Sequence, residues 1–515
     1  MLSIIPLLLL TSLIARQEPA AQDRPVGTVR FVTSCNTTAQ PIFSRGVALL
    51  HSFAFSQATE RFNAAREADP KCAMAWWGLA LAAWGNPFAA GNKTPAQIQR
   101  GIAAVQQARA VGAPTDRESR YIEAAARLYE RADSLDQRTR LLAYRDAMAE
   151  LVAREPADTE AAIFHALALA ISADPTDKTY ASQLQAGATL ERFSDKLPDH
   201  PGIAHYIIHT YDVPPLAGRA QNAAGRYDRI APTISHALHM PSHTWTRVGE
   251  WRRSVEANTA SAAAARREGS TAEQLHAADY RVYAYLQMGR LEEAKEVLDS
   301  VPALARRLDP VAIIGAAPPT AGFFAIAAIP ARYALERGQW AEAARLEVRP
   351  SPTPFADAVT WFARALGASR SGDTSAARSA IAELGVIRNR LVQAKETYWS
   401  EQLQIQIFAA QAWADLASGR KDLALEGMRT AATREDATEK NAITPGPLAP
   451  ARELLGEMLM EVNQPVPALA AFEATLQHEP NRSRAIVGAA QAASAAGNKA
   501  VAAKYQAQLK ELQRP

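Results

Sequence analysis

Apolar residues recur with the period of an α-helix along almost the whole chain. They return every three or four positions, which places them on one face of a helix. Clear examples are the segments 98–110, 116–131, 135–154, 158–171 and 387–418. No segment shows the sustained alternation of apolar and polar residues that is typical of a strand. The pattern therefore predicts an all-α protein.

A longer repeat lies on top of this helical period. Near the N-terminus a glycine, an alanine, a phenylalanine and a proline are separated by 12, 4 and 8 residues, and the same separations return near the C-terminus. The two sets are Gly46, Ala58, Phe62, Pro70 and Gly456, Ala468, Phe472, Pro480. The pattern resembles the tetratricopeptide repeat (TPR), a helix pair of 34 residues. In such a repeat we expect the small residues where two helices touch, the phenyl ring toward the next pair, and the proline at the end of the second helix.

A shorter signal fills the middle of the chain, where a glycine precedes an alanine by five residues. It occurs at Gly289/Ala294, Gly338/Ala343, Gly372/Ala377, Gly419/Ala424 and Gly497/Ala502. Each glycine is expected at the turn between two helices and each alanine at a close contact on the second helix. The predicted fold is an α-solenoid of about ten TPR-type antiparallel helix pairs. The Ala-, Gly- and Pro-rich stretch 308–321 suggests a division into N-terminal repeats, 22–310, and C-terminal repeats, 311–515.

The first residues follow a different pattern. An apolar run spans residues 2–14, and Arg16 and Ala20-Ala21 follow it. A run of about 13 residues is too short to cross a bilayer but has the length of a signal-peptide core. We expect a signal peptide over residues 1–21 and an exported protein, periplasmic or secreted, with no integral membrane segment after its removal.

Cysteine content and charge fit this expectation. The two cysteines, Cys35 and Cys72, are expected to form a disulfide in an oxidising compartment, the alternative being two separate buried thiols. The net charge of +3 comes from Lys and Arg that are spread along the chain. This distribution gives no support for nucleic-acid binding.

Histidine is the one residue type with an unusual distribution. Six of the ten histidines fall within 44 residues: His200, His205, His209, His236, His239 and His243. They include two pairs with i, i+4 spacing, His205/His209 and His239/His243, so each pair lies on one helical face. The two pairs are 34 residues apart, which is one repeat. The two pairs therefore occupy equivalent positions in neighbouring repeats. Because neighbouring helices pack closely, we expect the four imidazoles to approach one another.

The TPR resemblance implies that this face of the first helix of each pair lines a concave groove. Aligning the repeats on Gly249 and Gly289 matches His236, His239 and His243 with three residues of the next repeat. The expected groove patch is therefore His205, His209, His236, His239, His243, His276, Asp279 and Tyr283, with His165 as a further member.

Three interpretations of this patch stay open. The histidines could be structural. The groove could bind an anionic peptide or small molecule, with help from Arg247 and Tyr206. Finally, His205, His209, His239 and His243 could bind a transition-metal ion, with Asp212 or Asp279 as a possible carboxylate ligand. Imidazole ligands favour zinc, copper, iron or nickel over calcium or magnesium.

Enzymatic chemistry is less well defined. The H-E-x-x-H, G-x-x-x-x-G-K-[ST] and G-x-S-x-G motifs are absent. A metal-dependent hydrolase or oxidase, with Asp279 or Tyr283 as an acid–base partner, is therefore an alternative to a binding scaffold. The sequence identifies no catalytic residue.

Two segments carry a more specific resemblance. HPGIAHYIIHTYDVP with HALHMPSHTWTRVGEW, and the opening SCN…FSRGVALLHSF…DPKCAMAWWGLA, resemble a family of large, mostly uncharacterised TPR proteins. The similarity spans residues from about 31 to 300. It implies an α-solenoid with a decorated groove and no particular activity. The leading hypothesis is an exported scaffold that binds a ligand, a peptide or a transition metal, and a protein or peptide partner is expected.

Overall fold

A computed structural model describes residues 25–89 and 91–514, and within these residues every regular element is a helix. The predicted signal peptide at 1–21 lies outside them. The N-terminal half contains α1 (Ala39–His51), α2 (Phe55–Ala68), α3 (Ala73–Trp84), α4 (Pro95–Val111), α5 (Asp116–Arg127), α6 (Gln137–Arg154), α7 (Thr159–Ile171), α8 (Ala181–Ser194), α9 (Pro201–Thr210), the 3₁₀ helix η2 (Ala217–Ala220), α10 (Gln221–Ile230), α11 (Ser235–His239), α12 (Pro241–Arg247) and α13 (Trp251–Glu268).

The second half continues in the same way. It contains α14 (Thr271–Gln287), α15 (Leu291–Ala305), α16 (Pro319–Glu336), α17 (Trp340–Ala343), α18 (Pro354–Arg370), α19 (Thr374–Gln393), α20 (Thr397–Ala417), α21 (Lys421–Asp436), α22 (Ala451–Glu461), α23 (Pro465–His478), α24 (Ser483–Ala495) and α25 (Lys499–Leu512). The all-α prediction is confirmed.

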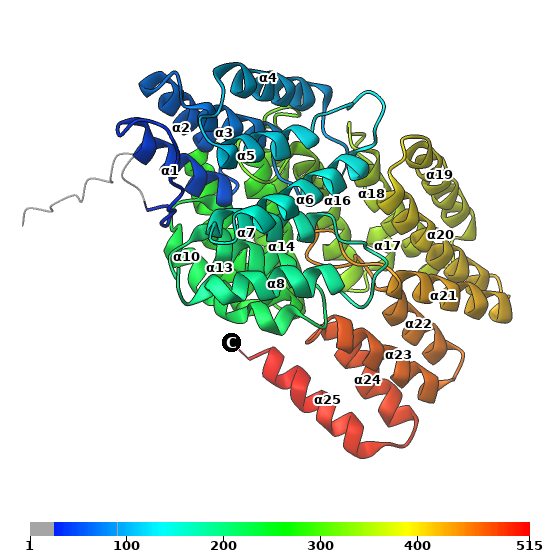
Figure 1. Ribbon diagram of the computed structural model, residues 1–515. Coiled ribbons are helices and arrows are strands. Elements are labelled where there is room, and N and C mark those ends of the chain that lie inside the picture. Colours follow the sequence, from blue (N-terminus) through cyan, green and yellow to red (C-terminus); the bar gives the residue numbers. More distant parts are fainter. Residues whose placement is uncertain (1–24, 90, 515) are drawn as a thin grey trace, which may run out of the picture.

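The helices form a solenoid that curls back on itself. Each helix packs mainly against its neighbours in sequence, as expected for stacked helix pairs. In Figure 1 the colours run from blue through green and yellow to the red α25, which ends near the green part of the chain. Two further contacts, α1 with α9 and α14 with α24, join segments that are far apart in sequence. Helices from distant repeats therefore also pack against one another, in addition to the packing between successive repeats.

The TPR landmarks pack as the repeat pattern predicts. The Phe62 ring on α2 lies between Gly46 on α1 and Gly78 on α3, where an added Cβ would come within 2.8 Å and 2.4 Å of the ring. A side chain at either glycine would collide with the phenyl group, so the close approach of three helices requires glycine. The same arrangement recurs at the other end of the chain with Phe472, Gly456 and Gly488.

The predicted turns are also confirmed. All five glycines of the shorter signal adopt positive φ, between 64° and 82°, directly after a helix. This left-handed conformation costs glycine little and other residues more. The five alanines that follow are buried on the next helix.

One predicted helix is wrong. Segment 387–418 is not continuous, because α19 ends at Gln393 and α20 begins at Thr397. Lys395 in the break adopts a φ of 58°. The apolar period continues across the break because both helices bury one side, so the period alone did not reveal the turn.

The core consists of two large apolar clusters, one mostly from residues up to Trp245 and one mostly from α16 to α25, with a smaller cluster around α13 to α16 between them. The division near residue 310 stays a prediction. The sulfur atoms of Cys35 and Cys72 lie at disulfide-bonding distance, with their Cα atoms 4.7 Å apart.

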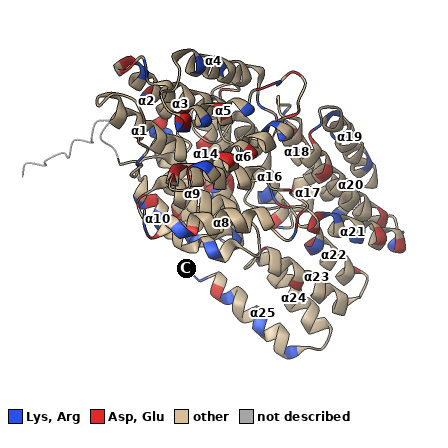
Figure 2. Cartoon of the chain, viewed as in Figure 1, with Lys and Arg blue, Asp and Glu red and all other residues tan. Residues whose placement is uncertain are grey.

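Residues of both charges are interspersed along the helices in the view of Figure 2. In the part of the chain that the structure describes, no helix has the length and apolar character needed to cross a membrane.

Candidate metal centre

The first histidine pair, His205 and His209, lies on α9, and the second is divided between the last residue of α11, His239, and α12, which contains His243. Helices α9 and α12 start with a proline, Pro201 and Pro241, which suits the first position of a helix because no backbone N–H is needed there. All residues of α9 and α12 are buried, since α1, α7, α8 and α10 surround α9 and α13 covers α12. Their polar side chains therefore face the interior of the protein.

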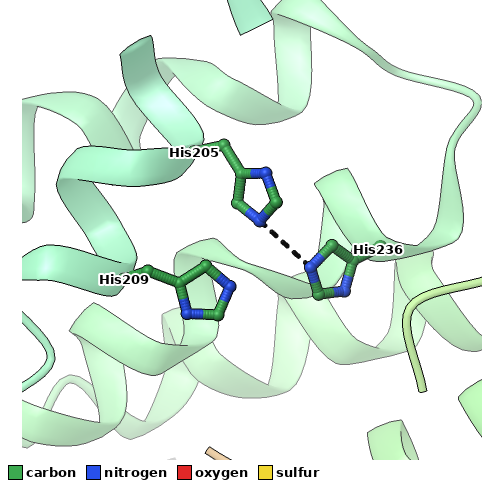
Figure 3. Close-up of side chains that lie close together, drawn as sticks. All are labelled: His205, His209 and His236. Carbon is green, nitrogen blue, oxygen red and sulfur yellow. Dashed lines mark hydrogen bonds between the residues drawn. The ribbon is translucent and has the colours of Figure 1, made fainter. Parts of the chain in front are cut away.

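The first group of histidines comprises His205, His209 and His236, which we call the α9 triad. One nitrogen of each ring lies within 4.8 Å of the others. Figure 3 shows the rings converging, with Nε2 of His205 3.1 Å from Nε2 of His236. The Nδ1 atom of His205 donates to the backbone carbonyl of His51 at 2.6 Å, which leaves Nε2 of this ring with a free lone pair.

The second group comprises His239, His243 and His276, which we call the α12 triad. Its ring nitrogens also lie within 4.8 Å of one another. The Nε2 atoms of His239 and His243 face each other at 3.0 Å. His276 reaches the group from α14, and its buried Nδ1 atom has no hydrogen-bond partner among the described residues.

Hydrogen bonds fix the proton positions in the α12 triad. Nδ2 of Asn258 donates to the Ser254 carbonyl at 2.8 Å, so Oδ1 of this amide accepts from Nδ1 of His239 at 2.6 Å. Nδ1 of His243 donates to the Asp212 carboxylate at 2.8 Å. In both neutral rings the proton is therefore on Nδ1, and two lone pairs face each other across 3.0 Å.

Asp212 is the centre of a buried charge network next to His243. Its carboxylate accepts from Nε of Arg247 at 2.9 Å and from Nζ of Lys440 at 2.8 Å. Burial alone would raise the pKa of this carboxyl, but Lys440, Arg247 and His243 hold the pKa well below its ordinary value. Asp212 is thus ionised and orients the His243 ring.

The imidazoles of both triads are neutral at physiological pH. Burial lowers the pKa of His205 and of His276 to about 3, and it lowers the pKa of His209, His236 and His239 well below the ordinary value. Burial also lowers the pKa of His243, although its hydrogen bond to Asp212 acts in the opposite direction. A proton shared between His239 and His243 is therefore disfavoured.

Loops cover the two triads. A cavity of about 30 Å³ touches His209 and His236 of one triad and His243 and His276 of the other. Its remaining wall comes from three connections, after α3, before α16 and between α21 and α22. The six histidines of the two triads are at most 9% exposed. The concave groove that the sequence analysis expected along these histidines stays a prediction, although loop residues lie against the rings.

A third cluster has a different character. Glu160 accepts from Nε2 of His51 at 3.0 Å and from Nε2 of His200 at 2.9 Å. The Tyr206 hydroxyl donates to Nδ1 of His51 at 2.9 Å. These hydrogen bonds join α1, α7 and α9 through a buried polar network, in which Nδ1 of His200 has no partner among the described residues.

The other predicted groove residues lie elsewhere. Asp279 is paired with Arg332 of α16 at 2.8 Å, and the Tyr283 hydroxyl accepts from Arg482 of the C-terminal repeats at 3.1 Å. Neither Asp279 nor Tyr283 belongs to a histidine triad, because each is hydrogen-bonded to one of these arginines. Tyr280, on the same helix α14, contacts His243 instead. His165 on α7 is half-buried and interacts with Arg145 and Asp146 of α6.

The sequence analysis missed two polar neighbours of the triads. Asn258 lies on α13, and Lys440 lies in the proline-containing connection between α21 and α22. Neither residue belongs to a recognisable motif. The only available signal for Lys440 was the length of a connection that is too long for a simple turn between two helices.

Comparisons with known proteins give only a distant likeness. No family model and no curated protein matches the chain. Among solved structures, a human IFIT1 dimer with m7Gppp-AAAA is 10% identical, covers 81% of this chain and 87% of its own, and has a TM-score of 0.36. The APC/C hetero-tetramer Cut9–Hcn1 is 13% identical, covers 90% of this chain and 77% of its own, and has a TM-score of 0.35. Scores this low carry no information about function.

Proposed function

We propose that this chain is a helical scaffold that binds a transition-metal ion in its interior, through the imidazoles of His239, His243 and His276. The observation that carries the proposal is the pair of Nε2 atoms that face each other at 3.0 Å while both rings donate from Nδ1. Two lone pairs at this distance repel unless a cation lies between them.

The surroundings support the same function. Ligands about 2.0–2.1 Å from one ion lie roughly 2.9 Å apart at a right angle and roughly 3.4 Å apart at the tetrahedral angle, and the 3.0 Å separation of the two nitrogens falls within this range. Metal-bound imidazoles usually donate their other N–H to a carboxylate or an amide oxygen. Asp212 and Asn258 are such partners.

The donor set narrows the class of ion. Three neutral imidazoles without thiolate favour zinc, copper, iron or nickel and disfavour calcium and magnesium. Three protein ligands also leave a coordination position for a small exogenous ligand. Metal binding requires that these rings are neutral and correctly oriented. Burial lowers the pKa of His239 and His243 and so keeps them neutral, and the hydrogen bonds to Asn258 and Asp212 orient them.

The test is a measurement of metal content. The chain is purified without a polyhistidine tag, stripped with a chelator, reloaded separately with Zn²⁺, Cu²⁺, Fe²⁺ or Ni²⁺, and analysed by mass spectrometry of the metal. We expect the double variant H239A/H243A to lose one ion per chain relative to the parent. The exposed His478 supplies the matched control, and H478A should retain the parent content.

Circular dichroism of each variant separates loss of a ligand from loss of the fold. Equal metal content in the parent and in a folded H239A/H243A variant would contradict the proposal. So would the absence of stoichiometric binding with all four ions.

We also infer that the protein is exported. The close approach of Cys35 and Cys72 supports an oxidising compartment. Mass spectrometry of protein from the native source should find an N-terminus after Ala21 and no free thiol. Retention of residues 1–21 together with two free thiols would contradict export.

A further inference from the structure

We propose that the α9 triad binds a second metal ion and that the two ions form a dinuclear centre with one small anion between them. This inference rests on the proposed function of the α12 triad and extends it to His205, His209 and His236. The argument uses the distance between the triads, the unpartnered nitrogens of the α9 triad and the cavity that both triads share.

The two triads are in direct contact. The ring centroids of His209 and His243 are 5.6 Å apart, and those of His236 and His239 are 6.1 Å apart. Two rings of each triad thus have a neighbour in the other triad at the distance of a side-chain contact. Two ions held by these rings would share one site rather than occupy separate sites.

The α9 triad contains a buried ring nitrogen that no group in the described part of the chain contacts by a hydrogen bond. Nε2 of His209 is buried and has no hydrogen-bond partner among the described residues. The nitrogen of His236 that faces the triad is Nε2, at 3.1 Å from Nε2 of His205, while its unpartnered Nδ1 lies on the other side of the ring (Figure 3). Buried polar nitrogens without partners are rare, because each costs the free energy of desolvation without a compensating bond. Coordination of a metal ion would give Nε2 of His209 the partner that it lacks.

Stacking holds the rings of the α9 triad in place. The His209 ring stacks on Phe88 with a centroid distance of 4.0 Å, and the His236 ring stacks on Phe53 at 5.6 Å. His205 is fixed by its bond to the His51 carbonyl. The three rings are therefore oriented before an ion arrives, which is what an efficient metal site requires.

The shared cavity identifies the class of additional ligand. It has a volume of about 30 Å³ and touches rings of both triads. This volume holds about two water-sized groups, since one needs roughly 10–15 Å³. Much of the remaining wall is apolar, with Phe88, Ala316 and Ile443 among its residues.

Charge favours an anion in this cavity. Two divalent ions would bring four positive charges into a buried site whose six imidazole ligands are neutral. The nearest carboxylate, Asp212, already neutralises part of the charge of Arg247 and Lys440. Buried charge is costly unless it is compensated. A small anion such as hydroxide, bound to both ions, fits the volume and supplies negative charge.

The experiment counts ions and tests their coupling. The tag-free parent is loaded with Cu²⁺, metal content is measured by mass spectrometry, and unpaired spins are counted by electron paramagnetic resonance. We expect two ions per chain and fewer spins than ions, because neighbouring Cu²⁺ ions couple magnetically. In H209A we expect one ion per chain and a spin count equal to the metal content, with H478A behaving as the parent.

The outcomes separate the two proposals. A single ion in the parent, lost in H239A/H243A, would overturn the dinuclear centre and leave the proposed function intact. No ion in the parent would overturn both. Two ions with a full spin count, or two ions retained in a folded H209A variant, would also overturn the dinuclear centre.

Azide, used as a probe, tests the shared anion. Calorimetric titration of the copper-loaded parent should saturate at one azide per two ions. Saturation at two azides per chain would show that each ion has its own open position and would contradict a common anion.

Discussion

Asp212 and Asn258 have the same role for the rings of His243 and His239. Each accepts a hydrogen bond from Nδ1 of its histidine, so that Nε2 of that ring keeps its lone pair. Asp212 also neutralises Arg247 and Lys440, which would otherwise repel an ion near His243. The properties of the centre therefore depend on residues that do not contact the ion.

The variant D212N tests this dependence. An asparagine no longer carries the negative charge, and its amide can present a donor to Nδ1 of His243. We expect affinity for Zn²⁺ to fall by about 10–100-fold, as is typical when such a partner is lost, and competition with a fluorescent chelator measures it. The control is D415N, at a buried carboxylate that pairs with Arg420 far from the triads. Equal affinities of D212N and the parent would contradict the assigned role.

The pH dependence of stability provides a second test at the residue scale. The buried histidines have lowered pKa values, so below about pH 6.5 the unfolded chain binds protons that the folded chain does not. Stability of the metal-free protein is then fully present above this pH and falls as the pH decreases toward the folded values. Each such histidine adds a slope of up to about 1.4 kcal/mol per pH unit.

Urea denaturation between pH 4.5 and 6 should therefore show a steep loss of stability in the presence of a chelator. In H276N the slope should be smaller by up to about 1.4 kcal/mol per pH unit, because one buried histidine is absent. An identical slope in parent and variant would show that His276 titrates normally in the folded protein.

At the scale of helices, the fold was largely predictable from the sequence because its determinants are local. The spacing of Gly46, Ala58 and Phe62 predicts how one helix pair packs, and the positive-φ glycines mark the turns. The break at Lys395 was not predictable from the apolar period, since that period continues on both sides of it.

Close helix contact gives a prediction at this scale. In G488A the new Cβ would lie 2.4 Å from the Phe472 ring, so the helices must separate, and we expect a loss of about 1–3 kcal/mol. Gly385 on α19 supplies the matched control, because no neighbouring atom lies within 4 Å of its Cβ position. G385A should gain about 0.5–1 kcal/mol through helix propensity. Chemical denaturation measures both, and a G488A variant as stable as G385A would contradict the packing.

At the scale of the whole molecule, the site depends on segments that the repeat pattern does not bring together. The 34-residue period predicted that His205, His209, His239 and His243 are neighbours. It did not predict their division into two triads, because His236 and His276 complete the triads from other helices. Nor did it predict the covering loops, whose positions depend on the curvature of the complete solenoid.

Closure of the solenoid depends on a buried arginine. Arg482 of the C-terminal repeats binds Glu453 at 2.7 Å, Glu336 of α16 at 2.9 Å and the Tyr283 hydroxyl of α14 at 3.1 Å. R482A removes the partner of the buried Glu336 carboxylate and one of the two arginines that pair with Glu453, and we expect a loss of about 3–5 kcal/mol. Faster hydrogen exchange in α23–α25 would accompany it. The exposed Arg349 is the control, and an R482A protein with the stability of R349A would contradict this closure.

The central claim is that the ring nitrogens of His239 and His243 bind one metal ion. Its most direct test is anomalous X-ray diffraction from crystals of the zinc-loaded protein, with data collected on both sides of the zinc absorption edge. We predict a difference peak about 2.0–2.1 Å from Nε2 of both residues. A peak only at other sites, or ordinary water density between the two rings in fully loaded crystals, would contradict the claim.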